Sequence, residues 1–145
     1  MVRVAIAGIN GRMGTMVSDI VLARTDMELV ADFDLSAGKQ VGTVKVSSAK
    51  DIDRVLKSVK PDVLIDFTAP SAAVGNVKAA AANGVRLVVG TTGFDEAQKK
   101  EMADAIEKGN VAAIISPNFS VGVQVFLKLL AAAARDLEGC DIEII

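Results

Sequence analysis

The stretch VRVAIAGINGRMG, residues 2–14, decides how the rest of the chain is interpreted. Its first six residues are mostly apolar and predict a buried strand, and glycines at positions 8, 11 and 14 follow at once. Glycines in this place let the chain turn tightly and let the backbone approach a pyrophosphate without a Cβ in between. The stretch therefore predicts a dinucleotide-binding turn. Its spacing is GxxGxxG rather than the commoner GxGxxG, and a glycine turn without a ligand is the alternative.

Outward from this motif, short strands alternate with longer helices. The pattern predicts strands at 2–7, 28–33, 63–66, 86–89, 111–115 and 141–145, and helices at 11–24, 49–58, 71–83, 95–108 and 121–137. Such alternation is typical of βαβ units, so we expect an α/β fold, a Rossmann-type doubly wound parallel sheet with helices on both faces. Residues 35–48 are expected to form a loop or a short edge strand.

The amino-acid composition excludes several kinds of catalytic and metal site. The 145 residues suit one domain, 51% of them are apolar, and none is His, Trp or Tyr. Without His, a Ser-His-Asp triad, an imidazole base and a His-ligated zinc are excluded within this stretch, and no metal site is expected. The single Cys140 is expected to pack in a core. A net charge of −2 and the lack of a long apolar run favour a cytoplasmic protein without nucleic-acid or membrane partners.

A dinucleotide site would also need an acidic residue near the end of the second strand, to accept hydrogen bonds from the adenosine ribose. Asp34 lies about 20 residues after Gly14 and fits this place. Asp32 is the competing candidate, but it falls inside the strand and could face solvent, and Asp34 could itself be a solvated loop residue. A carboxylate followed by Leu35 would repel a 2′-phosphate and favours NADH over NADPH, although Arg12 at the glycine turn could offset that repulsion.

Three later strands end in loops of a ligand-binding type. The loops are DFTAP at 66–70, GTTGF at 90–94 and SPNFS at 116–120. Because ligands of open α/β sheets bind beyond the carboxyl ends of the strands, we expect the loops to lie around one site. Each loop taken alone could be a plain strand exit or turn, and Ser120 is also a credible N-cap for the helix that follows.

Taken together, GINGRMG, DFTAP, GTTGF, SPNFSVGV and the terminal CDIEII resemble the 4-hydroxy-tetrahydrodipicolinate reductase family, formerly called dihydrodipicolinate reductase, over essentially the whole chain. That family reduces a cyclic intermediate of the diaminopimelate–lysine pathway with NADH or NADPH. The resemblance implies a small dicarboxylate heterocycle as substrate, NADH (preferred) or NADPH as cofactor, and a homotetramer for the complete enzyme.

The resemblance also implies roles for single positions. The glycine turn would hold the pyrophosphate and Asp34 the ribose, while Leu35 falls where some members carry an Arg that favours NADPH. Thr92 would border the nicotinamide and also face the substrate, and no other catalytic contact is expected in these 145 residues. The implied cofactor-binding residues are Gly8, Asn10, Gly11, Arg12, Met13, Gly14, Asp34, Phe67, Thr68, Gly90, Thr91, Thr92, Ser116, Pro117, Asn118 and Phe119.

Family members continue beyond the DIEII strand into a segment with two histidines, a lysine and a Ser-Gly-Thr that binds a substrate carboxylate. We therefore expect residues 1–120 to be an NAD(P)-binding domain and 121–145 to be the connecting helix and first strand of a truncated substrate and tetramerisation domain. Two functions stay open. One is reduction of 4-hydroxy-tetrahydrodipicolinate by the complete enzyme, with this chain supplying cofactor binding, and the other is a stand-alone NAD(H)-binding module without catalytic activity.

Overall fold

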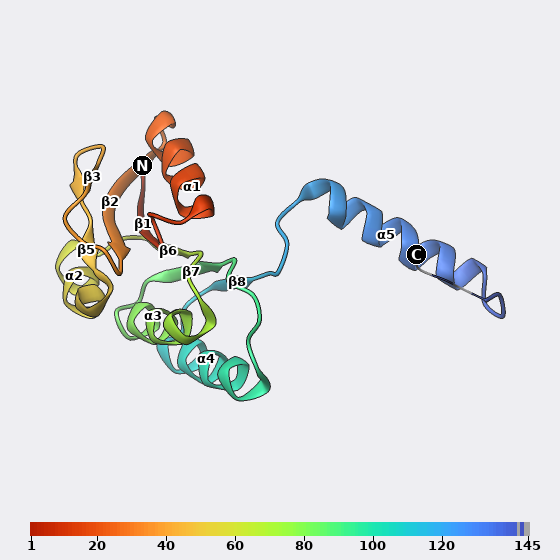
Figure 1. The fold of residues 1–145 in the computed structure, drawn as a ribbon. Helices are drawn as coiled ribbons and strands as arrows, with labels where there is room; N and C mark the ends of the chain where they lie inside the picture. The colour runs from red at the N-terminus through yellow and green to blue at the C-terminus, as the bar shows by residue number, and fades with distance from the viewer. Residues whose placement is uncertain (142, 144–145) are drawn as a thin grey trace.

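The computed structural model describes residues 1–141 and 143 and contains one six-stranded parallel sheet, ordered β5-β2-β1-β6-β7-β8 (Figure 1). Its strands are β1 (Val2–Ala7), β2 (Met27–Asp34), β5 (Ser47–Ser48), β6 (Val63–Asp66), β7 (Arg86–Val89) and β8 (Ala113–Ile115). The first strand lies inside the sheet, with β2 on one side and β6 on the other. The strand order therefore reverses direction at β1, which is where Rossmann-type sheets bind their ligands. The predicted fold class is confirmed.

Among the described residues, five α-helices connect or follow these strands. They are α1 (Arg12–Ala23), α2 (Ile52–Val59), α3 (Pro70–Ala82), α4 (Glu96–Gly109) and α5 (Val121–Asp136). Most predicted ends are correct to within two residues, but 49–51, expected to begin a helix, form the 3₁₀ turn η1 (Ala49–Asp51). The strand predicted at 141–145 includes 142, 144 and 145, which lie outside the described residues.

Capping side chains explain where two of the helices begin. The Oδ1 atom of Asp95 accepts a hydrogen bond from the backbone N of Gln98 at 2.7 Å, and the Gln98 side chain accepts one from the backbone N of Asp95 at 3.1 Å. This reciprocal capping box fixes the first turn of α4. Ser120 caps α5 more weakly, since its hydroxyl lies 3.4 Å from the backbone N of Val123. The predicted N-cap at Ser120 is confirmed.

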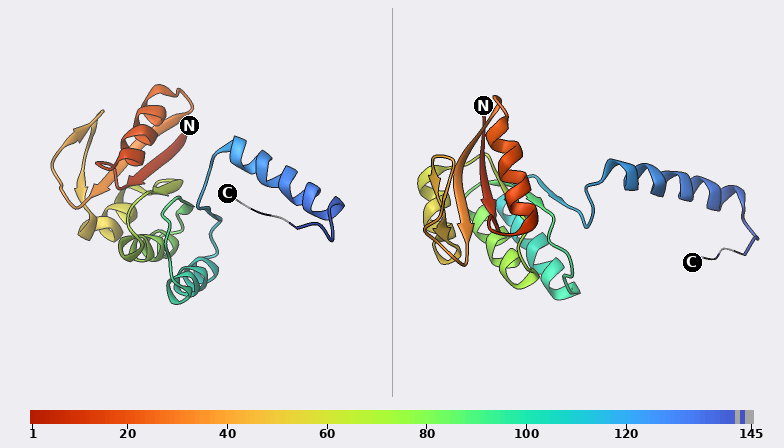
Figure 2. Two further views of the ribbon diagram at one scale, coloured as in Figure 1. Left: turned by 45° about the vertical axis from the view of Figure 1, so that its right-hand side comes forward. Right: turned by 45° about the horizontal axis from the view of Figure 1, so that its top comes forward.

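The two faces of the sheet are covered by different elements (Figure 2). Helices α2, α3 and α4 cover one face, where Leu56, Val77 and Met102 join the buried cluster that includes Phe33. The other face is covered by α1, which contributes Val21, and by the hairpin of β3 (Gln40–Val41) and β4 (Val44–Lys45). Residues 35–48 thus supply the expected edge strand, β5, and also a hairpin that the sequence did not predict.

Helix α5 lies apart from the sheet, and every one of its residues is exposed (Figures 1 and 2). The expectation that Cys140 packs in a core is wrong, because Cys140 is exposed and no element of the described chain covers this segment. Within the described residues, no helix is both long and apolar enough to cross a membrane.

Candidate functional site

The glycine turn joins β1 to α1 at the carboxyl edge of the sheet, and close contacts explain its glycines. A Cβ on Gly14 would overlap the carbonyl oxygen of Gly8. A Cβ on Gly8, whose φ is +85°, would lie 2.8 Å from the carbonyl oxygen of Phe67. The turn is therefore packed against the loop after β6 as only glycine allows. The N-terminus of α1 has no side-chain cap, so its first N–H groups are free to bind a phosphate.

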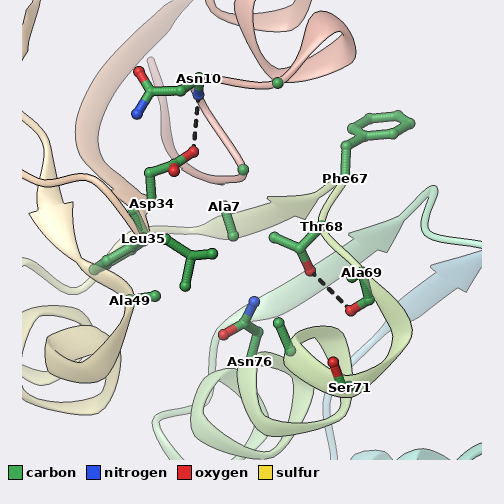
Figure 3. Close-up of a pocket in the computed structure, with 14 residues that line it drawn as sticks. Ala7, Asn10, Asp34, Leu35, Ala49, Phe67, Thr68, Ala69, Ser71 and Asn76 are labelled. Atoms are coloured by element: carbon green, nitrogen blue, oxygen red, sulfur yellow. Dashed lines mark hydrogen bonds between the residues drawn. The ribbon is translucent and has the colours of Figure 1, made fainter.

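Asp34 stands at the end of β2, beside the glycine turn (Figure 3). Its Oδ2 atom accepts a hydrogen bond from the backbone N of Asn10 at 3.0 Å, and its Oδ1 atom accepts a longer one from the backbone N of Ser36 at 3.4 Å. The Asn10 side chain donates in turn to the Ser36 carbonyl at 3.2 Å. A carboxylate can accept about four hydrogen bonds, so Asp34 keeps capacity for the two hydroxyls of a ribose.

Asp32 does not reach this edge of the sheet. It is fully buried and pairs with Ile6 of β1 in mid-strand, so the alternative that it faces solvent is wrong. Within the described chain, neither of its oxygens has a hydrogen-bond partner. Burial without a compensating contact raises the pKa of Asp32 to about 7. Of the two candidate acids, only Asp34 borders a pocket at the carboxyl edge.

That pocket, of about 450 Å³, opens between the glycine turn, the end of β2, η1 and the loop from β6 into α3 (Figure 3). This volume is within the range of small-ligand sites. Its walls are mainly apolar, and of the described residues that line it only Asp34 has an ionisable side chain. The lining residues are Ala7, Gly8, Asn10, Gly11, Phe33, Asp34, Leu35, Ala49, Phe67, Thr68, Ala69, Ser71, Ala72 and Asn76. We call this space the Asp34 pocket.

Beneath the Asp34 pocket, the buried side chain of Asp66 connects three elements. Its Oδ1 atom accepts hydrogen bonds from the backbone N of Thr68 at 2.9 Å, from the Thr68 hydroxyl at 2.8 Å and from the Thr91 hydroxyl at 2.9 Å. Its Oδ2 atom accepts one from the Asn76 amide at 2.7 Å. The loop after β6, helix α3 and the loop after β7 are thereby joined at one carboxylate.

The loops after β7 and β8 line a second pocket, of about 530 Å³. It is lined by Thr91, Thr92, Gly93, Phe94, Lys99, Met102, Ile115 and Pro117. The Phe67 ring, which lines the Asp34 pocket, packs where a Cβ on Gly90 would stand and meets the Phe119 ring edge-on, with 6.4 Å between centroids. The loops after β6, β7 and β8 are therefore neighbours, but their residues line two pockets and not the single site that was expected.

The structure separates the sixteen predicted site residues into groups. Six line the Asp34 pocket (Gly8, Asn10, Gly11, Asp34, Phe67 and Thr68), and three line the second pocket (Thr91, Thr92 and Pro117). Neither lining includes Arg12, Met13, Gly14, Gly90, Ser116, Asn118 or Phe119. Ser116 and Asn118 bond within their own loop, where the Ser116 hydroxyl donates to the Asn118 carbonyl at 2.9 Å.

Sequence reasoning missed Asn76, which is buried and lines the Asp34 pocket. A signal was present, because an Asn in the interior of an alanine-rich helix has poor helix propensity and suggests a buried hydrogen bond. As for metals, no cluster of three His, Cys, Asp or Glu side chains suited to an ion is found among the described residues.

Comparison with known proteins gives a consistent result. A family model described as "Dihydrodipicolinate reductase, N-terminus" matches residues 2–119. Over 144 residues the chain is 54% identical to the 4-hydroxy-tetrahydrodipicolinate reductase of Methanoculleus marisnigri, an alignment that covers 99% of this chain and 56% of the relative. The chain spans a little over half the length of the curated relatives it matches.

Solved structures agree with this match. The dipicolinate-bound dihydrodipicolinate reductase of Paenisporosarcina sp. TG-14 superposes with a TM-score of 0.80 at 32% identity, covering 92% of this chain and 54% of that one. The scyllo-inositol dehydrogenase of Lactobacillus casei with bound NAD(H) has a TM-score of 0.73 at 14% identity, covering 93% and 42% of the two chains. The second likeness shows the shared fold alone. From the family match and the identity to its relatives, this chain belongs to the dihydrodipicolinate reductase family.

Proposed function

We propose that this chain is the dinucleotide-binding part of a 4-hydroxy-tetrahydrodipicolinate reductase and that it binds NADH, and NADPH more weakly, in the Asp34 pocket. The observation that carries the proposal is the packing of the glycine turn. A side chain at Gly8 would meet the loop after β6, and one at Gly14 would overlap the Gly8 carbonyl within the turn. The uncapped N-terminus of α1 and the Asp34 carboxylate then border the same pocket.

Each part of the site has a distinct task in this proposal. The free N–H groups of α1 bind the pyrophosphate, with Arg12 and Met13 beside them, and Asp34 accepts from the ribose hydroxyls. Phe67 and Gly90 direct the other half of the cofactor toward Thr91, Thr92 and the loop at 116–119. The nicotinamide, when bound, supplies the hydride, and the protein supplies position and shielding from water.

The preference for NADH is supported by charge. In the described structure the Asp34 pocket has no Lys or Arg in its lining, and Asp34 would repel a 2′-phosphate. Leu35 stands next to Asp34, and its hydrocarbon side chain has no donor to offer the phosphate. Arg12 is exposed at the start of α1 and lies outside the pocket lining, where it compensates only in part.

The rest of the proposal concerns the longer protein. Residues 1–120 form the cofactor domain, and the exposed α5 leads from it toward a substrate domain, as the length of the relatives supports. The substrate is a small dicarboxylate heterocycle, since a structural relative was solved with dipicolinate, and Thr92 faces it across the second pocket. A homotetrameric, cytoplasmic enzyme completes this proposal.

Titration tests it. Purified chain is mixed with NADH, and cofactor fluorescence should rise and shift to shorter wavelength on binding. In a second assay, freshly generated substrate is added and NADH oxidation is followed at 340 nm. We expect binding without turnover by these 145 residues, because they contain no His and span a little over half the length of the curated relatives. Lack of any NADH binding would overturn the proposal, and turnover at the rate of a full-length relative would assign the catalysis to this chain.

A further inference from the structure

One buried side chain in the Asp34 pocket has no task in the proposed function. Asn76 is 6% exposed, projects from α3, and borders the pocket on the side opposite the glycine turn (Figure 3). Its amide carries a donor group and an acceptor group that point in opposite directions. Which of the two faces the pocket decides what kind of ligand atom can bind there.

Asp66 fixes the orientation of that amide. A carboxylate only accepts hydrogen bonds, so the Asn76 group that lies 2.7 Å from Asp66 Oδ2 must be the NH₂ donor. Three further donors from Thr68 and Thr91 hold the other carboxylate oxygen, so the Asp66 side chain cannot rotate away. The Asn76 carbonyl oxygen is therefore directed away from Asp66.

That carbonyl oxygen faces the pocket. In the described residues, the two carboxylate oxygens of Asp32 are the only side-chain polar atoms that are both inaccessible to solvent and without a hydrogen-bond partner. The Oδ1 atom of Asn76 is not among them, and no donor from the described chain contacts it, so it is open to the pocket that Asn76 lines. Figure 3 shows it on the side of the amide that faces Ala49. A fixed acceptor thus stands in a mainly apolar pocket.

The shape of the pocket suggests which part of the ligand reaches this acceptor. Asp34 holds the ribose in the proposed function, and beyond it Leu35 and Ala49 stand on one side of the pocket and Ala69 on the other (Figure 3). Ala72 is also part of the apolar lining. A flat purine ring attached to that ribose fits between such walls. The hydroxyl of Ser71 can donate or accept and so does not discriminate between bases.

We infer that Asn76 is a specificity-determining residue for adenine: its carbonyl oxygen, oriented by Asp66, accepts a hydrogen bond from the exocyclic amino group of the base. Asp66 is then a positioning residue, which acts through Asn76. Hypoxanthine carries an oxygen in place of that amino group and would set two acceptors against each other. The inference rests on the proposed function, since it requires the cofactor to lie in the Asp34 pocket.

The experiment compares NADH with its hypoxanthine analogue, which has the same fluorescent nicotinamide. The dissociation constants are measured by fluorescence titration, and their ratio is used because partial unfolding weakens both equally. The wild-type chain should bind NADH roughly tenfold more tightly than the analogue. If NADH does not bind at all, the proposed function fails. If both bind equally, the proposed function stands and the inference is overturned.

The variant Asp66→Asn gives a result that loss of structure cannot imitate. Its carbonyl oxygen keeps the three donors from Thr68 and Thr91, which places its NH₂ group against the NH₂ of Asn76. The Asn76 amide must then turn over and present a donor to the pocket. We expect the preference to reverse, with the hypoxanthine analogue bound roughly tenfold more tightly than NADH. A retained adenine preference would show that Asp66 does not orient Asn76.

Two further variants complete the test. Asn76→Ser removes the carbonyl and should bring the ratio of affinities close to one, whereas an unchanged ratio would overturn the role of Asn76. The matched control is Asp53→Asn, because Asp53 accepts a hydrogen bond from the Asn83 amide at 2.8 Å in the same kind of pair. Neither residue of that pair lines the pocket, so the wild-type ratio should be retained.

Discussion

Asp66 and Asp32 are both fully buried, and both lie in strands that pair with β1, yet their surroundings differ completely. Asp66 pairs with Ala7 at the carboxyl end of β6 and accepts four hydrogen bonds from neutral donors. Asp32 pairs with Ile6, one residue earlier, and has no partner in the described chain. Since neighbouring residues in a strand point to opposite faces, the two side chains lie on opposite sides of the sheet.

The difference shows that burial alone does not reveal what a carboxylate does. Buried charges are tolerated when hydrogen bonds replace the lost water, and Asp66 has such bonds from three separate elements. Asp32 shares the face of Ile6 and Ile65, which belong to an apolar cluster. Its protonated form is therefore favoured. Asp66 joins three elements next to the Asp34 pocket, whereas Asp32 has no partner in the described chain, and its raised pKa predicts a loss of stability as the pH rises.

The largest effect is expected from Asp66→Ala. The substitution leaves the buried amide of Asn76 without its acceptor and removes the two hydrogen bonds that Thr68 donates, whereas the Thr91 hydroxyl can still donate to the Thr68 carbonyl, 3.1 Å away. One orphaned buried donor, two lost hydrogen bonds and the cavity left by the side chain together destabilise a fold by about 3–5 kcal/mol. Chemical denaturation followed by circular dichroism measures the change. A loss below about 1 kcal/mol would mean that Asp66 is dispensable and would remove the contrast with Asp32.

Replacing Asp32 should have the opposite sign. Asp32→Val puts an apolar, β-branched side chain at a buried strand position and removes a carboxylate that lacks a partner. We expect the free energy of unfolding at pH 8 to rise by about 2–3 kcal/mol. Destabilisation at pH 8 would indicate that Asp32 makes a contact that the structure does not show.

The pH dependence of stability isolates the contribution of the Asp32 carboxyl. Its pKa is about 7 in the folded chain, well above the ordinary value of 3.8, so the folded state retains a proton that the unfolded state loses. The stability contributed by this group is complete below about pH 4, falls by up to about 1.4 kcal/mol per pH unit as the pH rises, and levels off above pH 7. Unfolding curves between pH 4 and 8 should show this fall in the wild type. In Asp32→Asn the corresponding component should disappear, and an equal slope in both proteins would contradict the assignment.

Local patterns predicted the strands, the glycine turn and Asp34, because each depends on residues adjacent in sequence. The bounds of β1, β6 and β7 were predicted correctly from short β-branched runs bounded by Gly, Asp or Pro. The place of Asp34 followed from its distance along the chain from the glycine turn.

Contacts between residues far apart in the sequence could not be predicted from local patterns. The partners of Asp66 are 10 and 25 residues away, at Asn76 and Thr91, and no periodicity specifies them. Asp32 and Asp34 cannot be told apart by strand periodicity, because residues two apart in a strand point to the same face. They differ because Asp32 lies in mid-strand and is buried, whereas Asp34 lies at the end of the strand and lines a pocket. The hairpin at 40–45 is likewise fixed by its packing on the sheet, which short strands do not reveal.

A smaller effect is expected at a single donor of the Asp66 cluster. Thr91→Val keeps the shape of the side chain and removes one hydroxyl, so stability should fall by about 1 kcal/mol. Thr91→Ser retains the hydroxyl and should recover most of this loss. If Ser and Val are equally destabilising, the methyl group of Thr91 matters more than its hydrogen bond, and the Asp66 cluster is weaker than its geometry indicates.

Asp34 differs from both buried aspartates, because it accepts fewer hydrogen bonds than Asp66 and is more exposed than Asp32. It is only partly buried and keeps acceptor capacity on the pocket side, so Asp34→Ala should change stability by less than about 0.5 kcal/mol. Its effect should instead appear in cofactor binding: NADH should bind roughly tenfold more weakly, because two ribose hydroxyls lose a charged acceptor. NADPH should lose less, since removal of the carboxylate also relieves its repulsion of the 2′-phosphate. Parallel titrations with the two cofactors measure the ratio, and a ratio equal to that of the wild type would exclude Asp34 from the ribose site.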